Sequence, residues 1–355
     1  MTSAGGTLGG RPTETARERA KLGRFATGPW NIPIRGWWEV LRRVAGSASN
    51  DEISQAAAAV AFYAFLSLVP ALIALVSSYA LIANPHDLSR LLGELDGTAP
   101  SHVLALLEQQ LSEIIAGSAT QLTLGVLVSL LVAWLSASRG VAAMMRAVNI
   151  AYREEETRGW LTRRWLAVRL SAGLSVFVAV AIAFITILPT LVGFLGLEPL
   201  VPLVRRMRWP FLAIAVMFGL GIFYRYAPNR TAPKWRWVLL GAALATAAWL
   251  LASMGLAYYV DSFGNFNATY GALGAIAALL LWFFVSAYAI LFGAELNAEL
   301  EHQTEVDTTV GPPRPMGRRA AAVADSVGPT LPSESWSETF KGMVRSARGC
   351  RRHKE

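Results

Sequence analysis

Four polar residues lie in or at the ends of long apolar stretches, and their types define the chemistry open to this chain. Glu295 and Asn297 lie at the end of the stretch 272–296, and Arg225 and Arg139 lie at the ends of two others. If these stretches cross a bilayer, charges at this depth are costly unless they are paired or face water. Such residues are therefore candidates for substrate binding or transport. A pair between Glu295 and an arginine fits this placement, and anchoring of the arginines at lipid headgroups is the alternative.

The segment between the last two apolar stretches is dense in side chains that bind through amide, hydroxyl and ring. It spans 261–271 and contains Asp261, Asn265, Asn267 and Tyr270. A re-entrant or tightly packed turn at the mouth of a cavity needs such groups to satisfy its backbone. A plain turn with aromatic residues at the membrane interface is an equal alternative.

The sequence contains no evident group of residues that could carry out catalysis. The four histidines are scattered over loops and tails with no partner at metal-ligand spacing: His86, His102, His302 and His353. Three consecutive glutamates, 154–156, lie among Arg153, Arg158, Arg163 and Arg164, which is typical of a solvated charge network. The chain carries neither a glycine-rich phosphate loop nor a nucleophile elbow. We therefore expect no enzyme activity, no catalytic residues, no metal and no cofactor.

The elements that must position these residues are six apolar stretches. About 20 mainly apolar residues are needed for a helix to cross a bilayer. The chain offers Ala56–Ile82, Leu122–Ala137, Leu170–Phe194, Trp209–Tyr226, Val238–Val260 and Ala272–Leu296. The second and fourth are short. These stretches predict an all-α polytopic bundle of about six membrane-spanning helices.

Charge asymmetry orients the bundle. All but four of the 32 Lys and Arg residues lie on the side of the membrane that holds both chain ends, and the exceptions are Arg90, Arg205, Arg206 and Arg208. Positive-inside bias therefore predicts cytoplasmic N- and C-termini, with the first stretch acting as an uncleaved signal. The net charge of +8 is dispersed over loops and tails rather than gathered on one face. This favours anionic lipid headgroups as partners over nucleic acid.

Three domains are expected: a disordered segment 1–33, a membrane domain 34–302 and a flexible basic tail 303–355. Helical spacing of Ile34, Trp37, Trp38, Leu41 and Val44, with Arg35, Glu39, Arg42 and Arg43 opposite, predicts an interfacial helix. Packing of that helix on protein is the alternative. The acidic outer segment 84–121 predicts two amphipathic helices, and a further one is expected within 336–347.

Two features concern helix packing. Pro70 and Pro189 each remove a backbone hydrogen bond in mid-stretch, so we expect a kink at each, lining a cavity or simply bending the helix. Small residues at Gly241, Ala245, Ala248 and Ala252 allow close helix approach. That face permits either packing within one chain or the formation of a homo-oligomer.

The chain resembles the YihY/BrkB family of bacterial inner-membrane proteins, once labelled ribonuclease BN. The resemblance rests on Ala57–Leu75, on Arg139–Arg164 with Asn149 and Arg158-Gly159, and on Arg225–Glu299, which includes NATYGALGAI and LFGAELNAEL. It covers most of residues 50–300 and implies a compact bundle of about six helices in the plasma membrane. It also implies an association with envelope integrity, host resistance and lipid movement. The ribonuclease label is not carried over, because the sequence lacks a catalytic constellation for RNA cleavage.

The functional expectation is therefore a transporter or translocase of a lipid or an amphiphilic anion. The alternative is a non-transporting membrane scaffold of the cell envelope that organises partners through its tails. An intramembrane or membrane-tethered enzyme, including a ribonuclease, is disfavoured.

Overall fold

Six long helices form the body of the protein. The computed structural model describes residues 15–48, 51–80, 119–196, 199, 201–262 and 266–329. The long helices are α3 (Asp51–Ala80), α6 (Ala119–Ala151), α7 (Trp160–Phe194), α8 (Val201–Tyr226), α9 (Trp235–Ser262) and α10 (Phe266–Glu301). Each long helix contains one of the six stretches predicted from the sequence, apart from the last two residues of the first stretch, 81–82, which the structure does not describe. Most of the helices extend beyond the predicted stretch into the flanking polar residues. The predicted all-α membrane bundle is confirmed, and no strand occurs among the residues that the structure describes.

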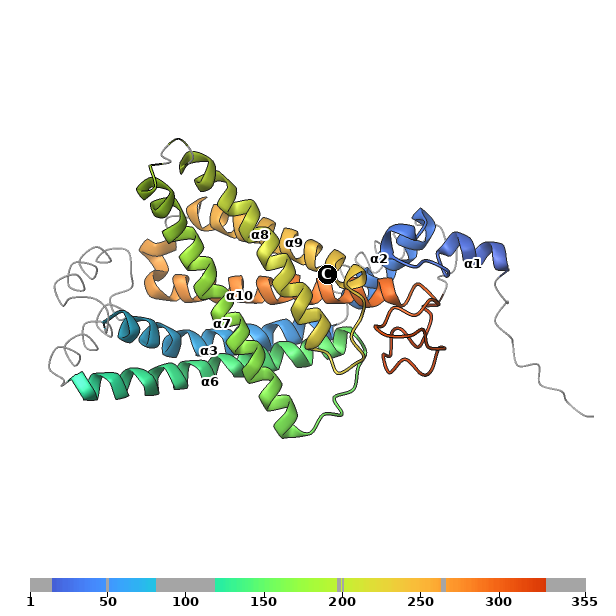
Figure 1. Ribbon diagram of the computed structural model, residues 1–355, viewed down its shortest axis with the longest axis horizontal. Helices are drawn as coiled ribbons and strands as arrows, with labels where there is room; N and C mark the ends of the chain where they lie inside the picture. Colours follow the sequence, from blue (N-terminus) through green and yellow to red (C-terminus); the bar gives the residue numbers. More distant parts are fainter. Residues whose placement is uncertain are drawn as a thin grey trace, which may run out of the picture.

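The six helices pack in a cyclic order. Each contacts the next along the series α3, α6, α7, α8, α9 and α10, and α10 returns to contact α3. In Figure 1, α3, α6 and α10 run side by side, while α7 and α8 cross them obliquely. Within the described residues, four segments are long and apolar enough to cross a membrane: Trp160–Ala181, Val201–Tyr226, Trp235–Tyr259 and Gly274–Glu301. In α3, the apolar stretch Ile53–Leu68 is shorter.

Helices α9 and α10 approach most closely at two glycines. A Cβ atom on Gly241 would lie 2.2 Å from the carbonyl oxygen of Gly293, and one on Gly293 would lie 2.7 Å from the Cβ of Ala245. Asn297 locks this contact, because its amide oxygen accepts from the N–H of Gly241 at 2.8 Å and its amide nitrogen donates to the carbonyl of Val238 at 3.1 Å. Gly241 and Ala245 of the predicted small-residue face therefore pack inside the chain.

The N-terminal segment folds against the end of α10. Thr15 and Glu18 form a capping box that starts α1 (Ala16–Leu22), and the turn η1 (Pro29–Asn31) leads into α2 (Ile34–Ala48). Val40 and Val44 of α2 are buried in a cluster with Trp237, Leu296 and Leu300. The predicted helix at 34–44 is confirmed, but its faces differ from the prediction, because Glu39 and Arg43 are buried. Ile34, Trp38 and Leu41 are exposed instead.

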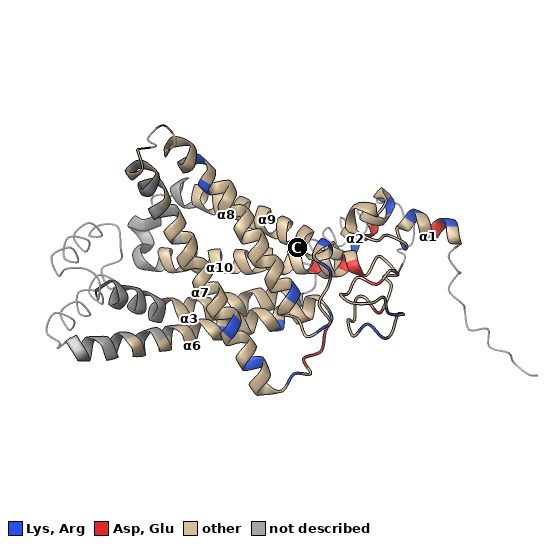
Figure 2. Cartoon of the chain, in the orientation of Figure 1, with Lys and Arg blue, Asp and Glu red and all other residues tan. Residues whose placement is uncertain are grey.

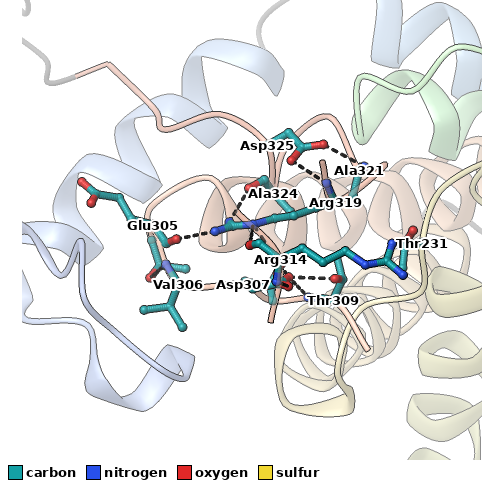
Figure 3. Close-up of polar contacts among 12 residues, drawn as sticks. Thr231, Glu305, Val306, Asp307, Thr309, Arg314, Arg319, Ala321, Ala324 and Asp325 are labelled. Carbon is teal, nitrogen blue, oxygen red and sulfur yellow. Dashed lines mark hydrogen bonds and ion pairs between the residues drawn. The ribbon is translucent and has the colours of Figure 1, made fainter. Parts of the chain in front are cut away.

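Residues 303–329 differ from the flexible tail expected from the sequence. They form a compact non-helical segment beyond α10 (Figure 3). Within it, Thr304, Thr308 and Thr309 are almost fully buried. Arg319 is 4% exposed, and its guanidinium donates to the carbonyls of Glu305, Arg314 and Ala324 at 2.7, 3.0 and 2.6 Å. These bonds satisfy backbone groups that a helix or sheet would otherwise pair. A composition rich in Pro, Gly and Arg therefore does not leave this part of the chain unfolded.

The same segment is joined to the loop before α9 and to the N-terminal segment. Pro233 and Thr309 form an isolated β-bridge, and the Thr231 N–H donates to the carbonyl of Ala320 at 2.9 Å. Thr304 Oγ1 bonds to the carbonyls of Arg24 and Ala26 at 3.1 and 2.8 Å. Burial alone would raise the pKa of Asp307, but hydrogen bonds from Thr309 and the Arg314 N–H outweigh it, and the pKa lies below its ordinary value.

Several predictions concern residues that the structure does not describe. The two amphipathic helices of the outer segment lie almost entirely in 81–118, and the helix within 336–347 also lies outside the described residues. Helix α9 continues to Ser262 and α10 begins at Phe266, so the predicted turn 261–271 is largely helical. Both α3 and α7 continue as helices through Pro70 and Pro189. Arg206 and Arg208 fall inside α8 near its start.

Substitution of Gly241 by Ala should destabilise the bundle, because the added methyl group collides with backbone of α10. Forcing a methyl group into such a contact costs about 1–3 kcal/mol, which lowers Tm. Gly255 in the same helix is the control, since a Cβ there meets nothing within 4 Å. Gly255→Ala should raise Tm slightly, because alanine is the better helix former by roughly 0.5–1 kcal/mol. Equal Tm values for the two variants in detergent would contradict the close contact.

Replacement of Arg319 by Met should release residues 303–329 while the membrane helices remain folded. The methionine fills similar space but leaves the carbonyls of Glu305, Arg314 and Ala324 without this donor, and the contact with Ala324 is buried. Limited proteolysis should then cut this segment much faster than in the parent protein. Arg318→Met is the control, because Arg318 is exposed. Unchanged cleavage of Arg319→Met would show that the guanidinium does not hold the segment.

Candidate functional site

One end of the bundle gathers most of the charged residues of the described chain. It is the end where α6, α8 and α10 finish and where α3, α7 and α9 begin, and we call it the polar end (Figure 1). Figure 2 shows blue and red residues concentrated there and in the adjoining segments, while the middle parts of the helices are almost free of charge. A site for a charged ligand is therefore sought at this end.

A fully buried ion pair lies at the end of α10. Arg230, from the loop before α9, binds both carboxylate oxygens of Glu301 at 2.6 and 3.1 Å, and both side chains are 0% exposed. Thr308 donates to Glu301 at 2.6 Å, and the guanidinium lies 5.0 Å from the centre of the Tyr152 ring. Burial alone would lower the pKa of Arg230, but the Glu301 carboxylate outweighs it and raises that pKa. The Arg230 guanidinium therefore stays protonated, and the pair joins α10 to the loop before α9.

A second cluster surrounds Glu299 on the same helix end. Its carboxylate pairs with Arg43 of α2 and with Arg153, which follows α6. His302 Nδ1 lies 3.7 Å from the Glu299 carboxylate and 3.2 Å from the Arg153 guanidinium. Arg153 has a φ of 56°, a left-handed conformation that is uncommon for a non-glycine residue. Glu39 lies 3.8 Å from Arg43 and adds a second carboxylate to this cluster. Every guanidinium of the two clusters thus has a carboxylate beside it, so we assign both clusters a structural role.

The two loops at the polar end are fastened to each other by amide side chains. Asn149 accepts from the N–H of Asn229 at 2.9 Å and donates to Glu156 at 3.1 Å. Arg158 binds Glu156 through two nitrogens, each at 2.7 Å, and this contact holds the pKa of Glu156 below its ordinary value. The predicted solvated network of 153–158 is thus largely a set of specific, partly buried pairs.

A further feature of the polar end is a pocket whose only charged lining residues, in the described part of the chain, are arginines. It has a volume of about 190 Å³ and lies between the end of α6, the start of α7 and Tyr63 of α3. Its lining residues are Tyr63, Arg139, Ala142, Arg146, Trp160, Arg163 and Arg164. Arg139 and Arg146 are exposed, and Arg163 and Arg164 are half-buried. We call it the four-arginine pocket.

The secondary structure explains why these arginines converge. Residues 139, 142 and 146 recur at helical spacing on α6, so they share one face of that helix. Arg163 and Arg164 lie in the first turns of α7, which packs against α6. None of the four has a carboxylate within ion-pair distance in the described part of the chain. Four like charges therefore lie together without compensation.

The residues that the sequence singled out do not form one site. Glu295 is 5% exposed, and its Oε2 has no hydrogen-bond partner among the described residues. Arg225 lies between the Tyr226 and Trp235 rings, at 5.5 and 4.9 Å, so it does not pair with Glu295. Arg139 lines the four-arginine pocket, and Asn297 fastens α9 to α10. The side chains of Asp261, Asn265, Asn267 and Tyr270, and those of Pro70 and Pro189, are outside the described parts.

Three of the four arginines in the pocket were not predicted as site residues from the sequence. It assigned Arg163 and Arg164 to a solvated network and did not consider Arg146. The available signal was the seven-residue interval between Arg139 and Arg146, which places both on one helical face. Among the described residues, no group of three or more His, Cys, Asp or Glu side chains is arranged to hold a metal ion.

Breaking the buried ion pair should strongly destabilise the polar end. Arg230→Met leaves Glu301 buried and unpaired, which costs about 3–5 kcal/mol in comparable pairs. The double variant Arg230→Met/Glu301→Leu should recover much of this loss, because neither charge then remains. Arg19→Gln is the control, since its pair with Glu305 is partly exposed and worth less than about 1 kcal/mol. Thermal unfolding of the four proteins tests this order, and a Tm of Arg230→Met equal to that of Arg19→Gln would contradict it.

Comparison with known proteins identifies the family. The family described as Virulence factor BrkB matches residues 44–316. The ribonuclease-like protein YfkH of Bacillus subtilis is 29% identical over 256 residues, covering 70% of this chain and 90% of that protein. A UPF0761 membrane protein of Alkalilimnicola ehrlichii is 30% identical over 266 residues, covering 72% of this chain and 57% of that protein.

A further relative extends the comparison. The UPF0761 membrane protein RSc1559 of Ralstonia nicotianae is 29% identical over 288 residues, covering 76% of this chain and 60% of the relative. The chain thus spans less than two thirds of both UPF0761 relatives. No solved structure matches. The match over residues 44–316 includes all six long helices and the polar end, and the chain belongs to the Virulence factor BrkB family of membrane proteins.

Proposed function

We propose that the protein is a transporter or translocase of an amphiphilic anion in the bacterial inner membrane, with the polar end and both termini on the cytoplasmic side. The observation that carries this proposal is the four-arginine pocket. Its lining includes four cations and no carboxylate, so it attracts a negatively charged group. The excess of basic residues at the same end supports the cytoplasmic orientation.

The surroundings of the pocket favour an amphiphile over a fully soluble anion. Trp160, Leu161 and Trp165 in the first turns of α7 are 70, 60 and 59% exposed. Exposed tryptophans at a helix end are typical of the membrane–water interface. A ligand whose charged group enters the pocket can therefore keep its apolar part in the bilayer.

The scaffold alternative is favoured by a different observation. Residues 303–329 form an ordered surface on the polar end, joined to both the N-terminal segment and the loop before α9. A platform of this kind suits protein partners. Under that alternative, arginine substitutions in the pocket leave function intact, while Arg319→Met, which releases the platform, removes it.

The printed name of the Bacillus relative mentions ribonuclease-like character, which is said of that protein alone. We propose that this chain has no ribonuclease activity. The residues that gather in the pocket are arginines and aromatic residues, which bind anions. The proposal therefore assigns them to recognition.

The transport proposal is tested by lipid flux in reconstituted vesicles. A short-chain fluorescent phosphatidylglycerol should cross faster in vesicles with protein than in empty ones. The double variant Arg139→Gln/Arg146→Gln should reduce that rate by roughly 100-fold or more, because each charge-assisted contact is worth about 1.5–3 kcal/mol.

The matched control is Arg169→Gln, which removes an exposed arginine of α7 that does not line the pocket. Its rate should equal that of the parent protein. No protein-dependent flux, or equal loss in both variants, would overturn the proposal.

A further inference from the structure

We propose that the four-arginine pocket binds the phosphate-monoester headgroup of a lipid and prefers it to a phosphodiester headgroup. This inference rests on the proposed function, because both proposals use the same pocket. It adds the chemical class of the ligand. The observation behind it is the convergence of Arg139, Arg146, Arg163 and Arg164 without a carboxylate.

The charge of the pocket selects for a multiply charged anion. Four guanidinium groups around one half-open pocket repel one another, and this Coulomb repulsion is stronger at the half-buried Arg163 and Arg164 than at the exposed Arg139 and Arg146. A bound anion relieves that repulsion in proportion to its charge. A phosphate monoester carries about −1.5 to −2 at neutral pH, while a diester carries a single negative charge.

The geometry of guanidinium groups points the same way. Each offers a planar fork of N–H donors that matches two phosphate oxygens. A monoester presents three free oxygens as acceptors. Forks that approach from two helices, α6 and α7, can therefore share one monoester. A diester keeps two oxygens free and carries a substituent on each side.

The volume of the pocket limits what enters it. At about 190 Å³, the cavity is smaller than the roughly 300–1,000 Å³ typical of sites that enclose a whole drug-sized ligand. The headgroup fits, but acyl chains do not. The rest of the ligand must then lie outside, against neighbouring apolar surface.

That surface is present on both sides of the pocket. On α3, Phe62 and Leu66 flank Tyr63 and are 55 and 52% exposed. On α7, Trp160 and Leu161 are also exposed. In a membrane these side chains face lipid, so acyl chains leaving the pocket meet apolar contacts rather than water. A lipid phosphate is thereby favoured over free phosphate.

The test is direct binding to the full chain in mild detergent, followed by native mass spectrometry and by tryptophan fluorescence. The probes are phosphatidic acid, phosphatidylglycerol, phosphatidylcholine and inorganic phosphate. Phosphatidic acid should bind at least about tenfold more tightly than phosphatidylglycerol at pH 8, and phosphatidylcholine should bind most weakly. This preference should shrink below about pH 6, because the monoester then loses its second charge. The pocket lining contains neither His nor a carboxylate.

Variants assign the effect to the pocket. Arg146→Gln and Arg164→Gln should each weaken phosphatidic acid binding roughly tenfold with unchanged Tm, and Arg146→Lys should restore only part of the affinity. Arg169→Gln should bind as the parent does. Equal affinity for the monoester and the diester overturns the inference. Full competition by inorganic phosphate at similar concentration overturns the lipid assignment.

The two proposals fail in different ways. Selective monoester binding without any flux in vesicles retains this inference and removes the transport function. Flux with no headgroup preference, and with no loss in Arg164→Gln, retains transport and removes this inference.

Discussion

The ion pairs between two carboxylates at the end of α10 and the surrounding arginines are the constraint on which the rest of the polar end depends. Glu299 and Glu301 are almost fully buried at the end of an apolar helix, where an unpaired charge would strongly destabilise the fold. Arg230 reaches Glu301 from the loop before α9, and Arg43 and Arg153 reach Glu299 from α2 and from the end of α6. These contacts fix the loops, and the loops fix where α7 and α9 begin.

This arrangement also explains why the four-arginine pocket can exist. Two of the three glutamates in the loop between α6 and α7 are already bound elsewhere. Glu156 is bound by Arg158, and Glu154 accepts from the N–H of Ala322 and lies 3.9 Å from Arg230. Separation of the charges into matched clusters and one unmatched pocket is therefore a property of the fold. A net positive charge alone would not produce it.

The sequence predicted the helices because a bilayer imposes a length and a polarity that can be read residue by residue. It did not predict the order in residues 303–329, because that order comes from Arg319 bonding to carbonyls that only the folded chain brings together. The pocket was missed for a similar reason. Arg139 and Arg146 share a helical face, which spacing reveals, but Arg163 joins them only through the packing of α7 on α6. The predicted pairing of Glu295 with an arginine failed because Arg225 is held by two aromatic rings.

Two polar features of the membrane helices have distinct physical roles. Asn297 makes a structural contact, since both ends of its amide bond to α9 where Gly241 and Gly293 touch. Sliding of α9 past α10 at this point would break both bonds. Glu295 lies one turn before Glu299 on α10, yet one of its oxygens has no hydrogen-bond partner among the residues that the structure describes. The contact between α6 and α7 is of another kind, because arginines from both helices line the four-arginine pocket there. Under the proposed function, an anion bound in that pocket contacts both helices.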